Sequence, residues 1–484
     1  MEKPERKSPN IIFILSDDQG PWALGCAGNP EIRTPNLDKL AADGMRFENF
    51  FCTSPVCSAA RATLLTGKIP SQHGVHDWIR EGNYGDNAIE YLTEEKGYTD
   101  IMSENGYTCG ISGKWHLGKS QKARHGFSHW YVHQKGSGHY YQAPMIRDGK
   151  LVKEEGYITD LITDDAISFM KKESRKEKPF YLSVHYTAPH GPWINEHPEE
   201  IVESYQNCDF NTCPQDYTHP DAIYRFKKED AYECLKGYFA AVTAMDKNIG
   251  RIIKKVEELG IRENTLICFL SDNGFNCGHH GIWGKGNGTL PLNMYDTSVK
   301  VPAIFSHPGK IPRGEVNNKL VSGYDMMPTL LDYIDLEDKD IDNLPGESFV
   351  NLLLGLNEKG RENVVIYDEY GPTRMIRTRD YKYIHRYPEG PHEFYDLKND
   401  PGEENNLIDS KDKKAIITFM KNKLEEWFEK YADPCIEGSS LPVSGNGQIK
   451  KVGKKNNNTS AFIQERPLIY DPQYDPGMKN KDED

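Results

Sequence analysis

The sequence predicts an α/β fold: a large, mostly parallel sheet sandwiched by helices, followed by a smaller C-terminal α+β domain built on an antiparallel sheet. Three observations lead to this prediction. Apolar runs typical of buried strands alternate with helical patterns over the N-terminal two-thirds of the chain. Asn10–Ser16 is one continuous apolar run, as expected of a strand covered on both faces. After about Gly360, short strands separated by turn residues take over.

The elements of the large domain follow one another in a regular alternation. Thr34 and Pro35 are expected to begin a helix that ends at Gly44, because Thr is a good N-cap, Pro is tolerated at the first helical position and Gly favours the C-terminal end. The other predicted strands are Thr108–Ser112, Phe180–His185, Leu266–Ser271 and Ser298–Phe305. The other predicted helices are Leu235–Leu259 and Asp325–Ile334.

Composition changes divide the chain into three expected parts. We expect a catalytic domain at 1–360, a small α+β domain at 361–437 and an irregular tail at 438–484. In the small domain, NVVIYDEY, TRMIRTRDYKYIHRY and HEFYDL indicate antiparallel strands, and Lys413–Tyr431 indicates a helix. The tail is rich in Gly, Asn and Lys and ends in the acidic NKDED. Residues 191–230 show little periodicity and fit either a substrate-facing lid or a surface excursion.

Charge and hydropathy exclude several functional classes. The 484 residues carry a formal net charge of −14, which disfavours nucleic acid as a partner because phosphate binding needs a basic face. A mean hydropathy of −0.71 and an early apolar run limited to Ile11–Leu15 argue against a membrane segment. MEKPERKSPN has no apolar signal region, so a cytoplasmic location is expected. The ten cysteines form no CxxC pair, which argues against a zinc ribbon or a disulfide scaffold.

The segment SPVCSAARATLLTG places a thiol where chemistry is expected. Cys57 stands at an apparent helix start, and Arg61 follows one helical turn later. A helix N-terminus attracts anions, and a nearby cation adds to this effect. These surroundings are expected to lower the pKa of the thiol and to hold a tetrahedral oxyanion. The alternative is that Cys57 is a small apolar residue packed in a helix.

Two predicted strands end in oxygen-bearing side chains. Asp17 and Asp18 follow the first strand, and Asp272 and Asn273 follow the strand at Leu266–Ser271. Parallel strands of open α/β sheets deliver functional residues at their carboxyl ends, so these four side chains are expected at one edge. Such hard oxygen ligands suit Ca²⁺, or less well Mg²⁺, rather than zinc. Taken one at a time, each pair could be only a turn.

Basic side chains follow other predicted strands. Lys114 and His116 lie two apart in GKWHLG, where an extended backbone would project both to one side. Such a pair can bind an anion and transfer a proton. His190 in TAPHGPW and Lys285 in GHHGIWGKGNGT are further candidates. His185 is expected to be structural, and His279 and His280 are weaker candidates for function.

These motifs together resemble those of type I sulfatases of the alkaline-phosphatase-like superfamily. DDQG, CSAAR, GKWHLG, APH, SDNG and WGKG occur in the family's order over most of the chain. The resemblance implies a Ca²⁺ held by Asp17, Asp18, Asp272 and Asn273, with residue 57 beside it as a further ligand. It implies that Cys57 is oxidised to formylglycine, the catalytic residue. It further implies that Arg61 steadies residue 57, that Lys114, Lys285 and His190 contact the sulfate, and that His116 orients the aldehyde hydrate and acts as a base.

The expected reaction is therefore hydrolysis of a sulfate ester. A hydroxyl of the hydrate would attack sulfur, His190 would protonate the leaving alcohol, and His116 would help to expel sulfate and restore the aldehyde. The expected substrate is a small O-sulfated saccharide. Ala59 stands where the commoner motif has proline, and this variant resembles substrates of the anaerobic radical-SAM maturase. That maturase is the expected partner; the oligomeric state is left open.

Residues near the motifs are candidates for substrate contact. They are His76, Asp77, Trp78 and Arg80 in HGVHDWIR, Trp283 in GIWGKG, and, from the C-terminal domain, Arg374, Arg377 and His385. A structural role is as compatible with each of them. Three rival functions remain: a phosphonate monoester or phosphodiester hydrolase of the same superfamily, a catalytically silent binding protein, and a thiol-based enzyme.

Overall fold

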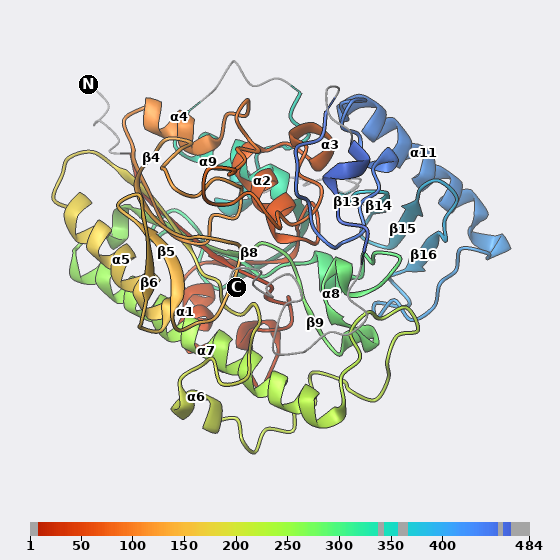
Figure 1. The fold of residues 1–484 in the computed structure, drawn as a ribbon, viewed down its shortest axis with the longest axis horizontal. Helices are drawn as coiled ribbons and strands as arrows, with labels where there is room; N and C mark the ends of the chain where they lie inside the picture. The colour runs from red at the N-terminus through yellow and green to blue at the C-terminus, as the bar shows by residue number, and fades with distance from the viewer. Residues whose placement is uncertain (1–7, 337–342, 357–365, 454–457, 466–484) are drawn as a thin grey trace.

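A ten-stranded sheet runs through the molecule, and the DDQG and SDNG motifs directly follow two of its strands (Figure 1). The computed structural model describes residues 8–336, 343–356, 366–453 and 458–465. Across the sheet the strands are β12 (Glu315–Ser322), β2 (Met45–Phe51), β11 (Ala303–Ser306), β8 (Thr265–Ser271), β1 (Asn10–Ser16), β7 (Phe180–His185), β3 (Thr108–Gly113), β4 (Phe127–His133), β5 (Ala143–Arg147) and β6 (Lys150–Glu154).

The centre of this sheet is parallel, as the sequence predicts. Strands β8, β1, β7, β3 and β4 pair in parallel, with Ile11 opposite both Leu266 and Tyr181. Strand β11 is antiparallel to both β2 and β8, and β5 and β6 continue the far edge as antiparallel strands. The carboxyl ends of β1, β8, β7 and β3 therefore meet at one edge of the sheet.

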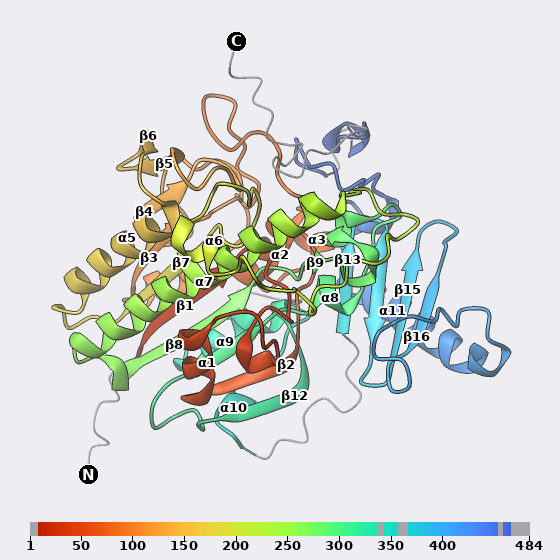
Figure 2. The same cartoon turned by 90° about the horizontal axis from the view of Figure 1, so that it is seen from below.

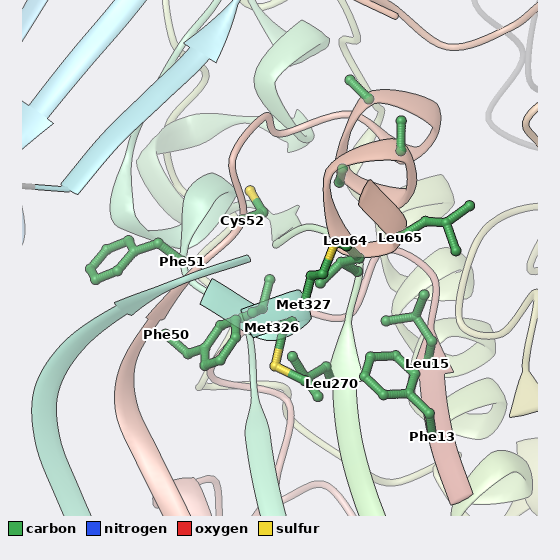
Figure 3. Close-up of a cluster of buried hydrophobic side chains, with 14 of the residues drawn as sticks. Phe13, Leu15, Phe50, Phe51, Cys52, Leu64, Leu65, Leu270, Met326 and Met327 are labelled. Carbon is green, nitrogen blue, oxygen red and sulfur yellow. The ribbon is translucent and has the colours of Figure 1, made fainter. Parts of the chain in front are cut away.

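Helices cover both faces of the sheet (Figure 2). On one face lie α1 (Pro35–Ala42), α5 (Ile158–Glu173) and α7 (Lys228–Glu258), and on the other lie α2 (Cys57–Thr66), α4 (Tyr98–Glu104) and α9 (Met326–Tyr333). Alternate residues of β1 divide between the two layers: Phe13 and Leu15 face the α2 side, and Ile12 and Ile14 face the α7 side. Figure 3 shows the first layer, where Met326 of α9 lies beside Leu270 of β8 and Met327 points toward Leu64 of α2.

A second sheet forms the C-terminal unit. Its strands are β13 (Ile366–Tyr370), β14 (Thr373–Arg377), β15 (Tyr381–Arg386) and β16 (Glu393–Asp396), all antiparallel, and α11 (Lys414–Tyr431) packs against them. Phe394 and Leu424 are fully buried between the sheet and this helix. The described part of the chain after Glu437 contains only the short helices Gly438–Ser440 and Asn458–Ala461 and folds back toward the large domain.

Several element predictions need correction. The segment Ser298–Phe305 is not one strand: α8 (Asp296–Val299) ends there, and β11 begins only at Ala303. The long helix begins at Lys228 rather than Leu235; its first turn is polar, so the apolar pattern did not reveal it. Strands β2, β4, β5, β6 and β12 were missed by the periodicity. The predicted boundary at 360/361 and the acidic NKDED lie outside the described residues.

Membrane-spanning helices and disulfide bonds were both disfavoured by the sequence. No helix of the described ranges has the length and apolar character that crossing a membrane requires. All ten cysteines are free thiols, and only Cys26, Cys208 and Cys435 are partly exposed.

Candidate active site

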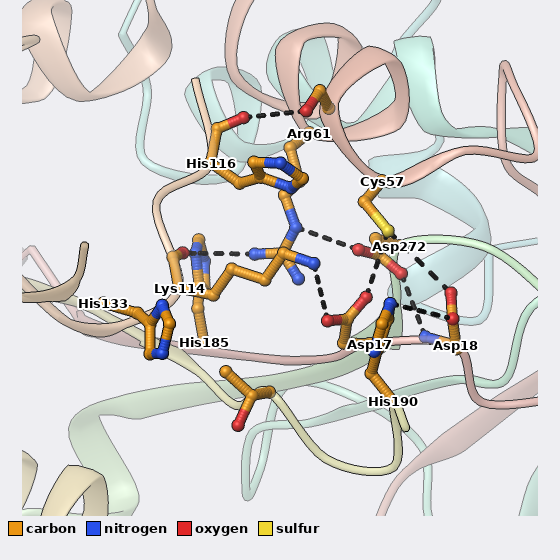
Figure 4. Close-up of polar contacts among 12 residues, drawn as sticks. Asp17, Asp18, Cys57, Arg61, Lys114, His116, His133, His185, His190 and Asp272 are labelled. Carbon is orange, nitrogen blue, oxygen red and sulfur yellow. Dashed lines mark hydrogen bonds and ion pairs between the residues drawn. The ribbon is translucent and has the colours of Figure 1, made fainter. Parts of the chain in front are cut away.

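The sheet edge gathers the predicted oxygen ligands around the start of α2 (Figure 4). Asp17 and Asp18 leave the end of β1, Asp272 leaves the end of β8, and Cys57 is the first residue of α2. One ligand atom from each of these four buried residues lies within 4.8 Å of the others. The juxtaposition expected from the strand ends is therefore present.

Backbone hydrogen bonds between the two strand ends explain this convergence. The Asp272 amide donates to the Ser16 carbonyl over 3.1 Å, and the Gln19 amide donates to the Ser271 hydroxyl over 3.0 Å. Asp18 has a φ of 65°, a left-handed conformation that Asp tolerates better than most residues and that turns the chain sharply after β1. The two loops are thus held together by backbone and side-chain hydrogen bonds, among them the bond from the Asp18 amide to Asp272 Oδ1 over 3.3 Å.

Each carboxylate contacts a buried cation. The Lys114 ammonium lies 2.6 Å from Asp17 Oδ2, and the Lys285 ammonium lies 2.5 Å from Asp18 Oδ1. A third pair joins Arg61 Nε to Asp272 Oδ2 at 2.9 Å. Burial alone would lower the pKa of Lys285, but the nearby negative charges, led by Asp18, outweigh it and hold that pKa well above its ordinary value. Lys285 is therefore a permanent cation.

The donor set fits a hard divalent cation. Asn273 donates from Nδ2 to Asp18 Oδ1 over 2.7 Å, while its own Oδ1 is buried and has no hydrogen-bond partner among the described residues. A buried carbonyl oxygen without a donor, beside three converging carboxylates, is a ligand set that Ca²⁺ or Mg²⁺ satisfies. Zinc would favour nitrogen and sulfur ligands instead.

The Cys57 thiol is buried between opposite charges. It donates to Asp17 Oδ1 over 3.2 Å and accepts from the Lys285 ammonium over 2.7 Å. Burial, followed by the charge of Asp17, holds the pKa of this thiol well above its ordinary value. The expectation that the helix start and Arg61 lower this pKa is therefore wrong: Arg61 binds Asp272 and the Lys114 carbonyl instead.

Two histidines line the same pocket. His190 lies with Nδ1 2.7 Å from the Gly191 carbonyl and with Nε2 3.6 Å from Asp18 Oδ2. His116 directs Nε2 to the Ile79 carbonyl at 2.9 Å, and its buried Nδ1 has no hydrogen-bond partner within the described residues. Burial and then Lys114 keep the pKa of His116 well below its ordinary value, so this ring is neutral.

The backbone around Lys114 differs from the prediction. Strand β3 ends at Gly113, and His116 has a φ of 55°. Lys114 and His116 therefore do not project from the same face of an extended strand. Lys114 reaches the carboxylates, whereas His116 reaches the pocket by way of the turn. His185 is partly buried, with Nδ1 3.2 Å from the Lys114 carbonyl and its ring against Phe13, consistent with a structural role.

The pocket extends outward from Cys57 between two walls. Trp78, Arg80 and Trp283 line it, as predicted for substrate-contacting positions. Aromatic and polar side chains that the sequence did not single out complete the lining: Lys135, Ser137, Trp193, Tyr224, Phe226, Phe275, Asn287 and Asn446. Three of these residues belong to segment 191–230, so that segment faces the pocket. The Trp and Tyr residues of this segment were the sequence signal from which its position at the pocket could have been predicted.

Other predicted positions lie away from the pocket and need correction. His76 and Asp77 are fully buried behind the wall, where His76 Nε2 lies 2.8 Å from the Ile436 carbonyl. Arg374 pairs with Glu369, and Arg377 pairs with Asp296, so neither reaches the pocket. The remaining three are held by ring contacts outside it: His385 on His392, His279 on Trp22 and His280 on Tyr295.

Comparisons with known proteins agree with this geometry. The sulfatase family model matches residues 9–336, and a model described as the C-terminal part of N-sulphoglucosamine sulphohydrolase matches residues 278–430. An N-acetylglucosamine-6-O-sulfatase of Bacteroides thetaiotaomicron is 28% identical, over 89% of this chain and 88% of that protein. An ulvan-active sulfatase of Formosa agariphila is 30% identical, over 89% and 83% respectively.

Solved structures with the same fold include one bound to its substrate. A complex with D-glucosamine-2-N,6-O-disulfate aligns with a TM-score of 0.76 and 26% identity, over 90% of this chain and 100% of that one. A phosphonate monoester hydrolase of Agrobacterium radiobacter has a TM-score of 0.67 at 20% identity, over 88% and 96%, a likeness of fold alone. Because the sulfatase model spans more than half of the chain, the protein belongs to the sulfatase family and is a sulfuric ester hydrolase of the alkaline-phosphatase-like superfamily.

Proposed function

We propose that the protein hydrolyses an O-sulfated carbohydrate, using a Ca²⁺ ion and a formylglycine made from Cys57. The observation that carries this proposal is the convergence of the Cys57 sulfur with Asp17, Asp18 and Asp272 at the bottom of a single pocket. A buried thiol with a raised pKa is a poor nucleophile, which argues against a thiol-based enzyme. The same position suits a residue that is oxidised before it acts.

The carbohydrate class is supported by the pocket and by the relatives. Trp193, Phe226 and Trp283 form an aromatic wall, and Trp283 stacks on Phe226 with ring centroids 4.6 Å apart. Flat aromatic surfaces pack against the apolar faces of sugar rings, while polar groups on the other wall can bind hydroxyls. Relatives with comparable coverage are described as acting on N-acetylglucosamine 6-sulfate and on ulvan.

Two groups would supply the central chemistry. Ca²⁺, held by Asp17, Asp18, Asp272 and Asn273, would polarise the sulfate and residue 57, and the aldehyde hydrate at position 57 would supply a hydroxyl nucleophile. Lys114 and Lys285, both buried and charged, offer N–H donors for the sulfate oxygens as negative charge develops on them. Arg61 holds Asp272 in place through its 2.9 Å bond.

The histidines divide the proton transfers. His190 lies on the pocket side of Asp18, and its Nδ1 hydrogen bond to the Gly191 carbonyl fixes the ring, leaving Nε2 to protonate the leaving oxygen. His116 is neutral, and its Nδ1 without a partner can accept a proton from residue 57.

Maturation of Cys57 is proposed to follow the anaerobic route. Ala59 is fully buried in the first turn of α2, where a residue's N–H has no partner within the helix. An Ala59→Pro variant therefore keeps the helix and restores the commoner motif, which makes it a matched control. Co-expression with each maturase, followed by mass analysis of the peptide containing residue 57, tests the route. Conversion of the natural motif by the oxygen-dependent enzyme alone would contradict it.

The decisive experiment is a sulfate-release screen on matured protein. A panel of sulfated mono- and disaccharides is incubated with the wild type and with Cys57→Ala, and free sulfate is measured. Release by the wild type alone is expected. Turnover of phenylphosphonate esters without sulfate release would instead favour a phosphonate monoester or phosphodiester hydrolase. Binding of sulfated saccharides without any turnover would indicate a silent binding protein.

A further inference from the structure

The outer half of the pocket is positively charged, although the chain as a whole is acidic. Beyond the residues that surround Cys57, the lining contains two cations, Arg80 and Lys135. Asp18 is the single carboxylate among the described residues that line the pocket, and it belongs to the proposed metal site. A cleft of this sign in a chain of formal charge −14 favours an anion there beyond the ester being cleaved.

Arg80 is the better placed of these two cations. Its guanidinium donates from Nη1 to the Asn446 carbonyl over 3.1 Å and lies 5.6 Å from the centroid of the Trp78 ring. It forms no ion pair with any carboxylate in the described ranges, in contrast to Arg61, Arg374 and Arg377. Its charge is therefore not neutralised by a carboxylate partner, and a guanidinium in this state binds sulfate or carboxylate through two N–H donors.

The tail fixes this arginine. The Arg80 amide donates to the Gln448 carbonyl over 3.0 Å, and the Trp78 indole donates to the Gly445 carbonyl over 3.2 Å. Gly447, with a φ of 109°, packs so closely that a Cβ there would lie 2.8 Å from Arg80 Cβ. The irregular tail is thus a wall of the pocket.

The same loop is also tied to the reaction centre. The Ile79 amide donates to the Ser58 hydroxyl over 3.0 Å, and Ser58 directly follows Cys57. The Ile79 carbonyl lies 2.9 Å from His116 Nε2. These two bonds of Ile79 hold the neighbouring Arg80 at a fixed distance from residue 57. A contact that determines specificity requires such a fixed distance.

We propose that Arg80 is a specificity-determining residue that binds a second anionic group, a sulfate or a carboxylate, on the saccharide whose ester is cleaved at residue 57. This inference rests on the proposed function and deepens it. The sugar ring would lie against the aromatic wall of Trp193, Phe226 and Trp283, with its second anion at Arg80. The natural substrate is then at least doubly anionic.

The test uses matured full-length protein and pairs of substrates. Each pair consists of one sulfated saccharide and the same molecule with one additional sulfate or carboxylate, for example glucosamine 6-O-sulfate and D-glucosamine-2-N,6-O-disulfate. The variants are Arg80→Gln, Arg80→Lys and Arg313→Gln, the last of which removes the same charge from an exposed position. The measurement is kcat and KM for sulfate release.

The wild type is expected to prefer the doubly anionic member. Arg80→Gln should lower its kcat/KM by about 10- to 100-fold, chiefly through KM, as expected for the loss of a hydrogen bond to a charged group. Arg80→Lys should lie in between, and Arg313→Gln should match the wild type. The singly anionic member should change by less than about twofold with Arg80→Gln, since uniform binding elsewhere is untouched.

The contrary outcomes distinguish a failure of the proposed role of Arg80 from a failure of the proposed function. An equal loss on both members of each pair, or a wild-type preference for the singly anionic member, overturns the role of Arg80 and leaves the sulfatase assignment standing. Absence of sulfate release from every saccharide in the panel overturns the proposed function, and the role of Arg80 falls with it.

Discussion

Two buried clusters of charge in this molecule contain the same kinds of side chains and do different things. The catalytic cluster consists of Asp17, Asp18, Asp272, Lys114, Lys285 and Arg61. The interface cluster consists of Asp296, Glu403, Lys382 and Arg377, and it joins the loop around α8 to the C-terminal sheet. Each places acids beside bases with little exposure to solvent.

The geometry of the pairs distinguishes the two. In the interface cluster the fully buried Lys382 ammonium contacts Asp296 and Glu403 at 2.6 and 2.5 Å, and Arg377 contacts both oxygens of Asp296. Burial would raise the pKa of Asp296, but Arg377 and Lys382 outweigh it and hold that pKa well below its ordinary value. The cations lie between the acids, so this cluster needs no further charge.

In the catalytic cluster the carboxylates themselves converge. Ligand atoms of Asp17, Asp18 and Asp272 approach within 4.8 Å, and each carboxylate has a cation of its own. Like charges so close together repel, and that repulsion favours a divalent cation among them. In the interface cluster two acids share one ammonium, whereas in the catalytic cluster each of three neighbouring carboxylates has a separate cation.

The largest expected effect comes from removing one converging carboxylate. Asp18→Asn should lower sulfate release at least about 100-fold, the scale on which single electrostatic partners act in catalysis. Wild-type protein should also gain thermal stability on adding Ca²⁺ after chelation, because a ligand of the folded state alone stabilises it. The variant should lose that gain. Asn fits the left-handed backbone at this position, so the fold should persist.

Calorimetry with and without Ca²⁺ checks this prediction independently of activity. Asp164→Asn, which removes an exposed carboxylate, serves as the control and should behave as the wild type. If Asp18→Asn kept the full Ca²⁺-dependent rise in Tm, the catalytic cluster would not be a cation site, and its difference from the interface cluster would disappear.

The next largest effect concerns the interface cluster. Lys382→Met leaves the buried Glu403 and the partly buried Asp296 without the ammonium they share, so we expect it to lower the free energy of unfolding by about 3–5 kcal/mol. Lys413→Met removes a partly exposed partner of Asp396 and should cost less than about 1 kcal/mol. Urea titration measures both. Folded Lys382→Met should keep its KM, because this cluster does not line the pocket; a KM raised tenfold would show that the two clusters are coupled.

The catalytic cluster was more predictable from the sequence than the pocket above it, for a physical reason. Asp17, Asp272 and Cys57 lie directly at the ends of buried strands or at a helix start, and such positions are fixed by strong local patterns. The central parallel strands were predictable on the same grounds. Even here, the extended backbone expected at Lys114 was wrong. The chain turns at His116, and a turn of this kind has no periodic pattern of apolar residues from which it could be predicted.

The pocket walls come from segments that lack such patterns. Trp193 and Phe226 belong to a loop, and Asn446 belongs to a tail that was expected to be irregular. Their meeting is set by long-range contacts such as Gly447 with Asp77, which no local window of sequence contains. For the same reason His76 and Asp77 were expected to contact substrate, whereas they support the wall from behind.

Asp77 provides the smallest and most selective test of the comparison, since it is a buried acid with no cation. Its carboxylate accepts hydrogen bonds from the Tyr370 hydroxyl at 2.6 Å, the Trp78 amide at 2.9 Å and the Gly447 amide at 3.1 Å. Burial nevertheless raises its pKa to about 6, from an ordinary value of 3.8. Hydrogen bonds alone therefore do not offset burial as Arg377 and Lys382 do for Asp296.

A raised carboxyl pKa has a definite sign in stability. Between about pH 4 and pH 6 the folded protein keeps the Asp77 proton that the unfolded chain releases, so this group's contribution falls as pH rises through that window. The advantage of the wild type over Asp77→Asn in unfolding free energy should shrink by about 2 kcal/mol from pH 4 to pH 7. Urea titrations of both proteins across this range measure it, and the subtraction removes the carboxylates they share. Tyr370→Phe, which removes a donor to the ionised form, should move the window to higher pH. A difference that stayed constant or grew with pH would mean that Asp77 is ionised throughout, and that three hydrogen bonds can do for a buried acid what the two cations do in the interface cluster.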